Sequence, residues 1–193
     1  MHGTEEQSIK VSVVMPVYNT QEYLGECMDS VLNQTLKKIE IICVDDGSTD
    51  DSPALLDGYA DTDRRVRVLH ITNGGYGHAV NMGMEHARGK YISIVEPDDY
   101  IEKGMLERLY TISEEYGLDM VNADCMHFSG EGVARIFQKS RMINNDSLYN
   151  TVIHPFHDRE IFKGGFINPA GLFNRNFLEK NHIRHNESPG ASF

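Results

Sequence analysis

Short apolar segments alternate with amphipathic segments along the first two thirds of the chain. The apolar segments are rich in valine, isoleucine and leucine, which is typical of strands buried inside a sheet. They predict strands at Val11–Val17, Ile39–Val44, Val66–Ile71 and Tyr91–Val95. The segments that follow them predict helices over residues 22–34, from about residue 51, over 76–86 and over 103–116. A further strand is predicted over residues 119–128.

Strands that alternate with helices in this way predict an α/β fold, with a mostly parallel central sheet and helices on both of its faces. After residue 129 the pattern fades, and only a short helix over 177–180 is predicted. We therefore expect a disordered lead of residues 1–10, an α/β domain of residues 11–129 and an irregular C-terminal part of the same domain, residues 130–193.

Composition narrows the classes of function. The chain has 193 residues, 40% hydrophobic and 24% charged, enough for the core of one ordinary domain. Its net charge of −11, without a dense run of lysine or arginine, argues against a nucleic-acid partner. No apolar run is long enough to cross a bilayer, and the polar N-terminus lacks the apolar core of a signal peptide. The three cysteines stand far apart, which suggests a reducing compartment.

Polar residues gather where the predicted strands end. In chain order, the strands lead into Pro16-Val17-Tyr18-Asn19, Asp45-Asp46-Gly47-Ser48, Asn73-Gly74-Gly75 and Glu96-Pro97-Asp98-Asp99. Ligands of an open parallel sheet bind beyond the carboxyl ends of its strands. We therefore expect these four loops to converge on one site.

The two acidic motifs carry the candidate chemistry. Glu96, Asp98 and Asp99 place three carboxylates within four positions, and such charges repel unless a cation offsets them. Mg²⁺ and Mn²⁺ prefer carboxylate oxygens and leave positions for substrate phosphates. A carboxylate of Asp45 or Asp46 can accept a hydrogen bond from a nucleotide base or ribose. For each motif alone, an acidic turn that caps the next helix is the alternative interpretation.

The phosphate-binding motifs of other nucleotide proteins are missing. The sequence has no Gly-x-x-x-x-Gly-Lys-Ser/Thr loop. Gly75-Tyr76-Gly77 begins like a dinucleotide fingerprint, but Val80 stands where its third glycine belongs. The sequence therefore favours a nucleotide site of a different kind.

In order and spacing, the four motifs together resemble those of family 2 glycosyltransferases with the GT-A fold, of the bacterial surface-polysaccharide type. The resemblance covers residues 11–124 and resumes at 168–173 and 177–181. It implies transfer of a sugar, with inversion, from a nucleotide donor (a UDP-sugar) to a glycan or lipid-linked acceptor. It also implies a place in the cytoplasm, near the inner face of the cell membrane.

The resemblance also implies roles for single residues. Nucleotide contacts are expected from Pro16, Val17, Tyr18, Asp45, Asp46, Asn81 and Asp98. Glu96 and Asp98 are expected to hold Mn²⁺ or Mg²⁺, although the family more often has aspartate at the first of these positions. Val80 stands where the family often has arginine, which implies that one phosphate or base contact is lost or comes from another residue. His78 is a candidate to supply it.

The general base is the largest departure from the family. An inverting transferase needs a base that takes the proton of the acceptor hydroxyl. In the family this is an aspartate that follows the segment resembling residues 186–193. We therefore expect the base to lie beyond Phe193 and the chain to be truncated, because Glu187, the nearest carboxylate, matches the base poorly.

Two other functions stay open. A non-catalytic module that binds a nucleotide sugar or a partner protein would explain a missing base. A nucleotidyltransferase would need a glycine-rich basic loop after the first strand, and Pro16-Val17-Tyr18-Asn19 is not one.

Overall fold

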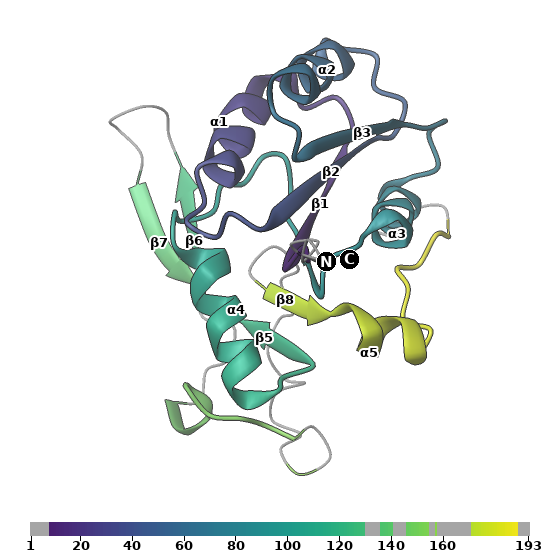
Figure 1. Cartoon of the computed structure of the whole chain (residues 1–193). Helices are drawn as coiled ribbons and strands as arrows, with labels where there is room; N and C mark the ends of the chain where they lie inside the picture. The colour runs from purple at the N-terminus through teal and green to yellow at the C-terminus, as the bar shows by residue number, and fades with distance from the viewer. Residues whose placement is uncertain (1–7, 130–135, 141–145, 155–156, 158–170, 189–193) are drawn as a thin grey trace, which may run out of the picture.

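A computed structural model gives the fold of the chain (Figure 1). It describes residues 8–129, 136–140, 146–154, 157 and 171–188. About half of the predicted C-terminal part, and residues 1–7 of the predicted lead, lie outside these ranges. Within the lead, Ile9 and Lys10 lengthen the sheet at the N-terminal end of its first strand: Lys10 N–H donates to Lys38 O (2.8 Å), and Lys90 N–H donates to Ile9 O (3.2 Å).

The main sheet of the described residues has six strands in the order β3-β2-β1-β4-β8-β5. They are β1 (Val11–Val17), β2 (Ile39–Asp45), β3 (Val66–His70), β4 (Tyr91–Ile94), β5 (Met120–Asn122) and β8 (Gly171–Asn174). β1 pairs in parallel with β2 and β4, and β2 with β3, whereas β8 is antiparallel to both of its neighbours. The predicted α/β fold with a mostly parallel sheet is confirmed.

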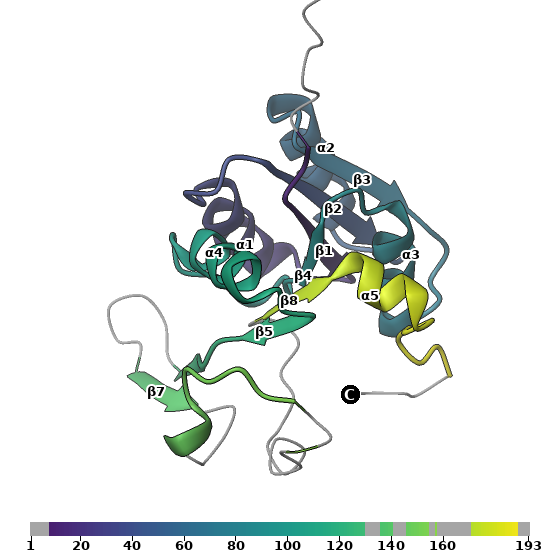
Figure 2. The ribbon, with the colours of Figure 1, turned by 60° about the horizontal axis from the view of Figure 1, so that its bottom comes forward.

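Helices cover both faces of this sheet, as predicted (Figure 2). The helices of one face are α1 (Gln21–Leu32), α2 (Ser52–Thr62) and α4 (Met105–Tyr116), and those of the other are α3 (Tyr76–His86) and α5 (Arg175–Lys180). Successive residues of a strand point to opposite faces. In β1, Val13 and Met15 join the core under α1, α2 and α4, while Val14 joins the core under α3 and α5.

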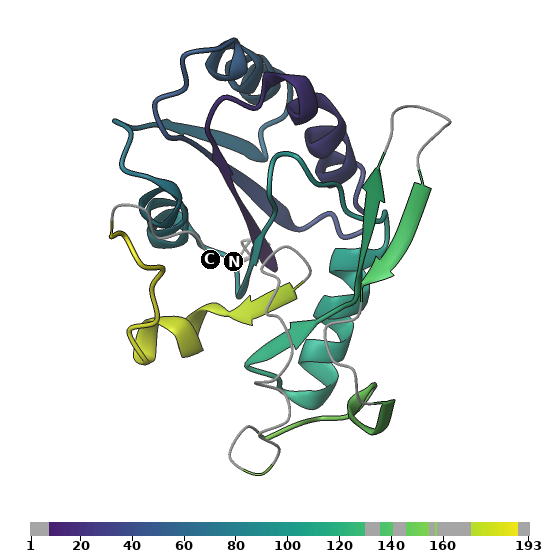
Figure 3. The same ribbon diagram turned by 180° about the vertical axis from the view of Figure 1, so that it is seen from behind.

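The predicted strand over 119–128 is wrong as a single element. The chain forms β5 there and then β6 (Cys125–Ser129), which pairs with β7 (Ile136–Ser140) in a separate two-stranded sheet (Figure 3). A short 3₁₀ helix follows at Asp146–Leu148. β8, which inserts between β4 and β5 in the main sheet, is not among the predicted strands.

Gly83 lets α3 approach β1 closely. A Cβ atom added at Gly83 would collide with the branched side chain of Val14, which is fully buried in the sheet. The backbone of α3 therefore lies against the strand. Packing against β1 therefore explains why this position is a glycine.

We predict that Gly83→Ala lowers the free energy of unfolding by about 2 kcal/mol, because the new methyl group overpacks the core. Gly58→Ala is the matched control, since Gly58 also lies in a helix (α2) but an added Cβ there meets no atom within 4 Å. The control should gain about 0.8 kcal/mol from helix propensity. Denaturant unfolding measures both, and equal effects of the two substitutions would contradict the packing argument.

Candidate functional site

The four parallel strands end at one edge of the sheet, and their loops form a continuous rim. In register, Val17 at the end of β1 pairs with Asp45 at the end of β2, and Asp45 pairs with His70 at the end of β3. Asp46 N–H donates to Val17 O (2.8 Å), so the first two loops leave the sheet together. The predicted convergence of the loops is confirmed.

The loops that follow β1 and β2 are joined by direct hydrogen bonds. Asn19 N–H donates to Ser48 Oγ (3.1 Å), and Asn19 Oδ1 accepts from Thr49 N–H (2.7 Å). Asn19 has a left-handed backbone conformation (φ 52°), which asparagine adopts more readily than most residues. Gln21 N–H, at the start of α1, donates to Asp50 Oδ2 (3.0 Å). Each loop therefore fixes the conformation of the other.

Asp46 joins the β2 loop to the loop before α3. Its carboxylate accepts from Gly74 N–H and Gly75 N–H, one bond to each oxygen and both 2.8 Å long. The Asn73 amide donates to Asp46 O (2.9 Å). Asp46 is buried, and these bonds satisfy a charge that would otherwise be costly to bury. The structure thus gives Asp46 a clear part in holding the rim.

The Asp45 side chain points toward the face of the sheet that α1 and α2 cover, whereas Asp46 bonds the loop before α3 on the other face. Its Oδ1 accepts from Ser48 N–H (2.9 Å), and its Oδ2 contacts His70 Nδ1 (2.8 Å). Its side chain is only 5% exposed. The two adjacent aspartates are therefore separated by the sheet and have different partners. A nucleotide contact by either one stays a prediction.

The residues predicted to line the base differ in exposure. Pro16 and Val17 are buried at the end of β1, whereas the Tyr18 side chain lies 51% exposed just beyond it. Tyr18 alone of these three therefore offers an open ring face, and an aromatic ring is a suitable surface for stacking a base.

The acidic loop after β4 is attached to α3 and α1. Tyr76 Oη donates to the Glu96 carboxylate, and Cys27 Sγ donates to Glu96 O (3.3 Å). Burial raises the pKa of Glu96 to about 7, and the charges of Asp98 and Asp99 act in the same direction against the Tyr76 hydrogen bond. Burial and the charge of Asp98 also raise the pKa of Asp99. The three carboxylates are therefore close enough to repel one another.

The fit of this loop to a divalent cation is partial. The described residues contain no group of three histidine, cysteine or acidic side chains arranged to hold a metal by themselves. However, one or two carboxylates suffice for Mg²⁺ where substrate phosphates complete the shell. Asp98 is exposed. Burial is the main cause of the raised pKa of Glu96 and of Asp99, and a neighbouring carboxylate charge adds to it in each case; a bound cation would offset that added charge.

Asn81 holds the C-terminal segment, residues 185–188. Its amide Nδ2 donates to His185 O (3.0 Å) and to Glu187 Oε1 (2.6 Å), and its Oδ1 accepts from His185 N–H (2.9 Å). Gly77 allows this approach, because an added Cβ would collide with Asn186 O. A contact between Asn81 and the nucleotide stays a prediction.

Glu187 has surroundings unlike those of a general base. The hydrogen bond from Asn81 is the main reason that the pKa of Glu187 lies below its usual value, and His78, 3.4 Å away, adds to this. A base that works near neutral pH needs a raised pKa. This agrees with the poor match of Glu187 to the family's base. His78, the candidate to replace the contact of the family's arginine, pairs with Glu187, and Val80 is fully buried in the core.

Two residues of the rim, Tyr76 and His70, are not among the predicted site residues. The sequence pattern predicts only a helix at Tyr76 and only a strand at His70. For His70 a signal was available: it lies at the end of its strand, as Asp45 does, and parallel strands bring such ends together.

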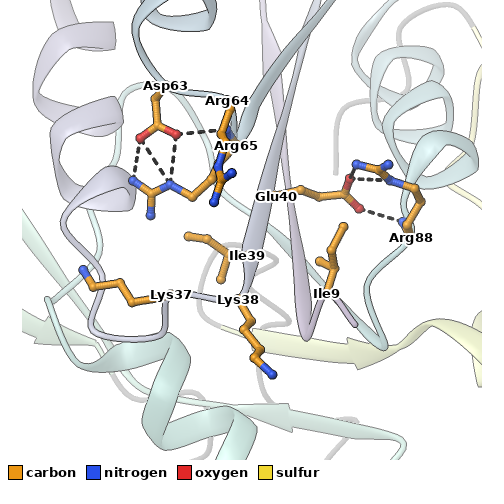
Figure 4. Close-up of a pocket in the computed structure, with 9 residues that line it drawn as sticks. All are labelled: Ile9, Lys37, Lys38, Ile39, Glu40, Asp63, Arg64, Arg65 and Arg88. Atoms are coloured by element: carbon orange, nitrogen blue, oxygen red, sulfur yellow. Dashed lines mark hydrogen bonds and ion pairs between the residues drawn. The ribbon is translucent and has the colours of Figure 1, made fainter. Parts of the chain in front are cut away.

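A cavity of about 500 Å³ lies at the opposite, amino edge of the sheet (Figure 4). It is lined mainly by basic residues: Lys37, Lys38, Arg64, Arg65 and Arg88, with Ile9, Ile39, Glu40 and Asp63. Arg65 pairs with Asp63 and Arg88 with Glu40, both at 2.7 Å, so much of this charge is neutralised. None of the predicted site residues lines this cavity.

Comparison with known proteins identifies the family. Residues 12–181 match the sequence model described as Glycosyl transferase family 2. The chain belongs to this family.

Relatives of this family 2 chain include bacterial glycosyltransferases. It is 50% identical over 112 residues to glycosyltransferase GlyG of Streptococcus pneumoniae, covering 58% of this chain and 37% of GlyG. It is 34% identical over 163 residues to the poly(ribitol-phosphate) beta-glucosyltransferase of Bacillus spizizenii, covering 82% of this chain and 26% of that protein. The chain thus spans no more than 37% of the length of either relative.

Solved structures of S. aureus TarS share the fold. The complex of TarS 1-349 with UDP has a TM-score of 0.74 and 25% identity, over 95% of this chain and 52% of that one. The complex with UDP-GlcNAc has a TM-score of 0.71 and 27% identity, over 91% of this chain and 48% of that one. These matches confirm the predicted GT-A-like fold. No helix in the described part of this family 2 chain is long and apolar enough to cross a membrane.

We predict that Asn81→Ala speeds hydrogen exchange of the His185 amide about tenfold, because that N–H loses its acceptor and the segment loses its clamp. Amide exchange measured by NMR or mass spectrometry tests this. His78→Ala is the control, since it removes only the longer contact to Glu187 and should change the rate less. Unchanged exchange in Asn81→Ala would mean that the segment is held by other contacts.

Proposed function

We propose that this family 2 chain forms the donor-binding part of a glycosyltransferase that takes its sugar from a UDP-sugar. The observation that carries the proposal is the bonded rim, in which Tyr18, Asp45 and the acidic loop lie at one edge of one sheet. TarS supports the choice of nucleotide, since its structures hold UDP and UDP-GlcNAc in a similar fold.

Within this proposal the rim divides into two halves. Tyr18 offers a ring for the base, with Pro16 and Val17 behind it, and Asp45 offers carboxylate oxygens to a base or ribose donor. The acidic loop faces the diphosphate.

We further propose that Asp98, with Glu96, holds Mg²⁺ or Mn²⁺ when the donor is bound. The cation would neutralise charge that builds up on the leaving diphosphate. The contribution of the chain is to keep the two carboxylates in place: Tyr76 fixes Glu96, and Asp98 stays open to solvent. Neighbouring carboxylates that repel one another favour a bound cation over an empty loop.

We extend the proposal to the acceptor and the stereochemistry, with the family resemblance as its support. We expect a glycan or lipid-linked acceptor and inversion at the anomeric carbon, with a base supplied from outside the described residues. Residues 11–129 would bind the donor, and the part from residue 130 would face the acceptor. The three free cysteines agree with a reducing, cytoplasmic compartment.

Calorimetric titration of UDP into the chain tests the proposal. With Mn²⁺ we expect saturable binding at one site, and EDTA should weaken it because the metal bridges the carboxylates and the phosphates. Asp98→Ala should weaken binding at least about tenfold, as loss of a metal ligand does. Asp61→Ala is the matched control, an exposed aspartate on α2 that should bind UDP as the unsubstituted chain does.

Two results would count against this account. A folded chain that fails to bind UDP with Mn²⁺ would contradict the UDP-sugar proposal as a whole. Binding that is equally tight in EDTA and in Asp98→Ala would leave the nucleotide site standing but contradict the role of the metal.

A further inference from the structure

Asp45 is held by two donors of different kinds. The backbone N–H of Ser48 belongs to the same loop and bonds Oδ1, while the imidazole of His70 comes from the neighbouring strand and contacts Oδ2 at 2.8 Å. The carboxylate of Asp45 is buried, whereas the His70 side chain is 45% exposed. His70 therefore lies between Asp45 and solvent and holds the Asp45 carboxylate from that side.

His70 is itself oriented by a second carboxylate. Its Nε2 lies 3.1 Å from Oδ1 of Asp57 on α2. An ionised carboxylate can only accept hydrogen bonds, so each ring nitrogen that bonds one must carry a proton. The hydrogen bond to Asp45 is the main reason that the pKa of His70 lies above its usual value; burial opposes this, and Asp57 adds to it. The ring is thus fixed with Nδ1–H directed at Asp45.

A fixed carboxylate has a specific use at this position. A carboxylate offers about four lone-pair directions, and Ser48 and His70 occupy two of them at Asp45. The remaining directions can receive a donor group of a ligand only if the carboxylate does not rotate. Ser48 bonds one oxygen alone, so the second bond, from His70, is what fixes the plane of the carboxylate.

We propose that His70 is a positioning residue of the donor site, which holds the carboxylate of Asp45 in the orientation that accepts a hydrogen bond from the nucleoside part of the donor. The inference rests on the proposed function, because it takes Asp45 as a nucleotide contact. It assigns the positioning role to the Nδ1 hydrogen bond. The bulk of the ring and the contact of Nε2 with Asp57 are less important for the orientation of Asp45.

Three substitutions of His70 separate Nδ1 from the rest of the ring. Asparagine carries its amide nitrogen two bonds from Cβ, as Nδ1 is, and can still donate to Asp45. Glutamine carries its amide one bond further out, where Nε2 lies, and alanine carries no donor. UDP affinity is measured by calorimetry with Mn²⁺ for each variant of the 193-residue chain. Thermal unfolding is measured in parallel.

We expect His70→Ala and His70→Gln to weaken UDP binding about tenfold, the effect of losing one hydrogen bond to a charged group. His70→Asn should remain within about twofold of the unsubstituted chain, because the hydrogen bond is restored. His86→Ala is the control: His86, near the C-terminal end of α3, contacts Met82 O and should leave affinity unchanged.

The outcomes distinguish this inference from the function on which it rests. Equal affinity in the unsubstituted chain, His70→Ala and His70→Asn would overturn the positioning role and leave the UDP site intact. Equal weakening in His70→Ala and His70→Asn, with unchanged thermal unfolding, would overturn the role of Nδ1. A folded unsubstituted chain that does not bind UDP would overturn the proposed function, and this inference with it.

Discussion

Parallel pairing of β1 with β2 and β4 is the constraint on which the rest of the molecule depends. Because neighbouring strands run in the same direction, their carboxyl ends meet at one edge, and each following loop starts beside the next. The register sets the details: Val17, Asp45 and His70 lie in one row at the strand ends. The fold thus collects polar side chains from distant parts of the sequence before any ligand is present.

The rim keeps its shape because its charged groups are shared between loops. Asp46 joins the β2 loop to Gly74 and Gly75, and Tyr76 joins the start of α3 to Glu96. Burial raises the pKa of Glu96 to about 7, and the charges of Asp98 and Asp99 act in the same direction, so acidic side chains are concentrated at this edge. Such an edge is suited to a ligand that brings a cation with its phosphates. The TarS complexes hold UDP and UDP-GlcNAc, both of which carry a diphosphate.

The sequence predicts the fold well where local pattern decides it. Apolar runs mark the four parallel strands, and parallel topology then places their loops together without further information. It predicts less where long-range contacts decide. β8 is only four residues long and joins the sheet beside β4, about 80 residues earlier in the chain, so no local signal marks it. Likewise, the partners of Asn81 lie in the segment 185–187, and its place in a motif could not reveal them. His70 shows the intermediate case, because its role depends on the register of β3 against β2.

The central claim is that a nucleoside diphosphate binds at the carboxyl edge of the sheet, and mapping UDP contacts by amide NMR in the presence of Mg²⁺ tests it most directly. The account predicts the largest shift changes at Tyr18 and Asn19, at residues 45–48 and at residues 98–100, which all lie on the rim. The basic cavity at the amino edge, around Lys38 and Arg64, is the competing site for an anion. Shift changes confined to that cavity, or absent from the rim, would contradict the account.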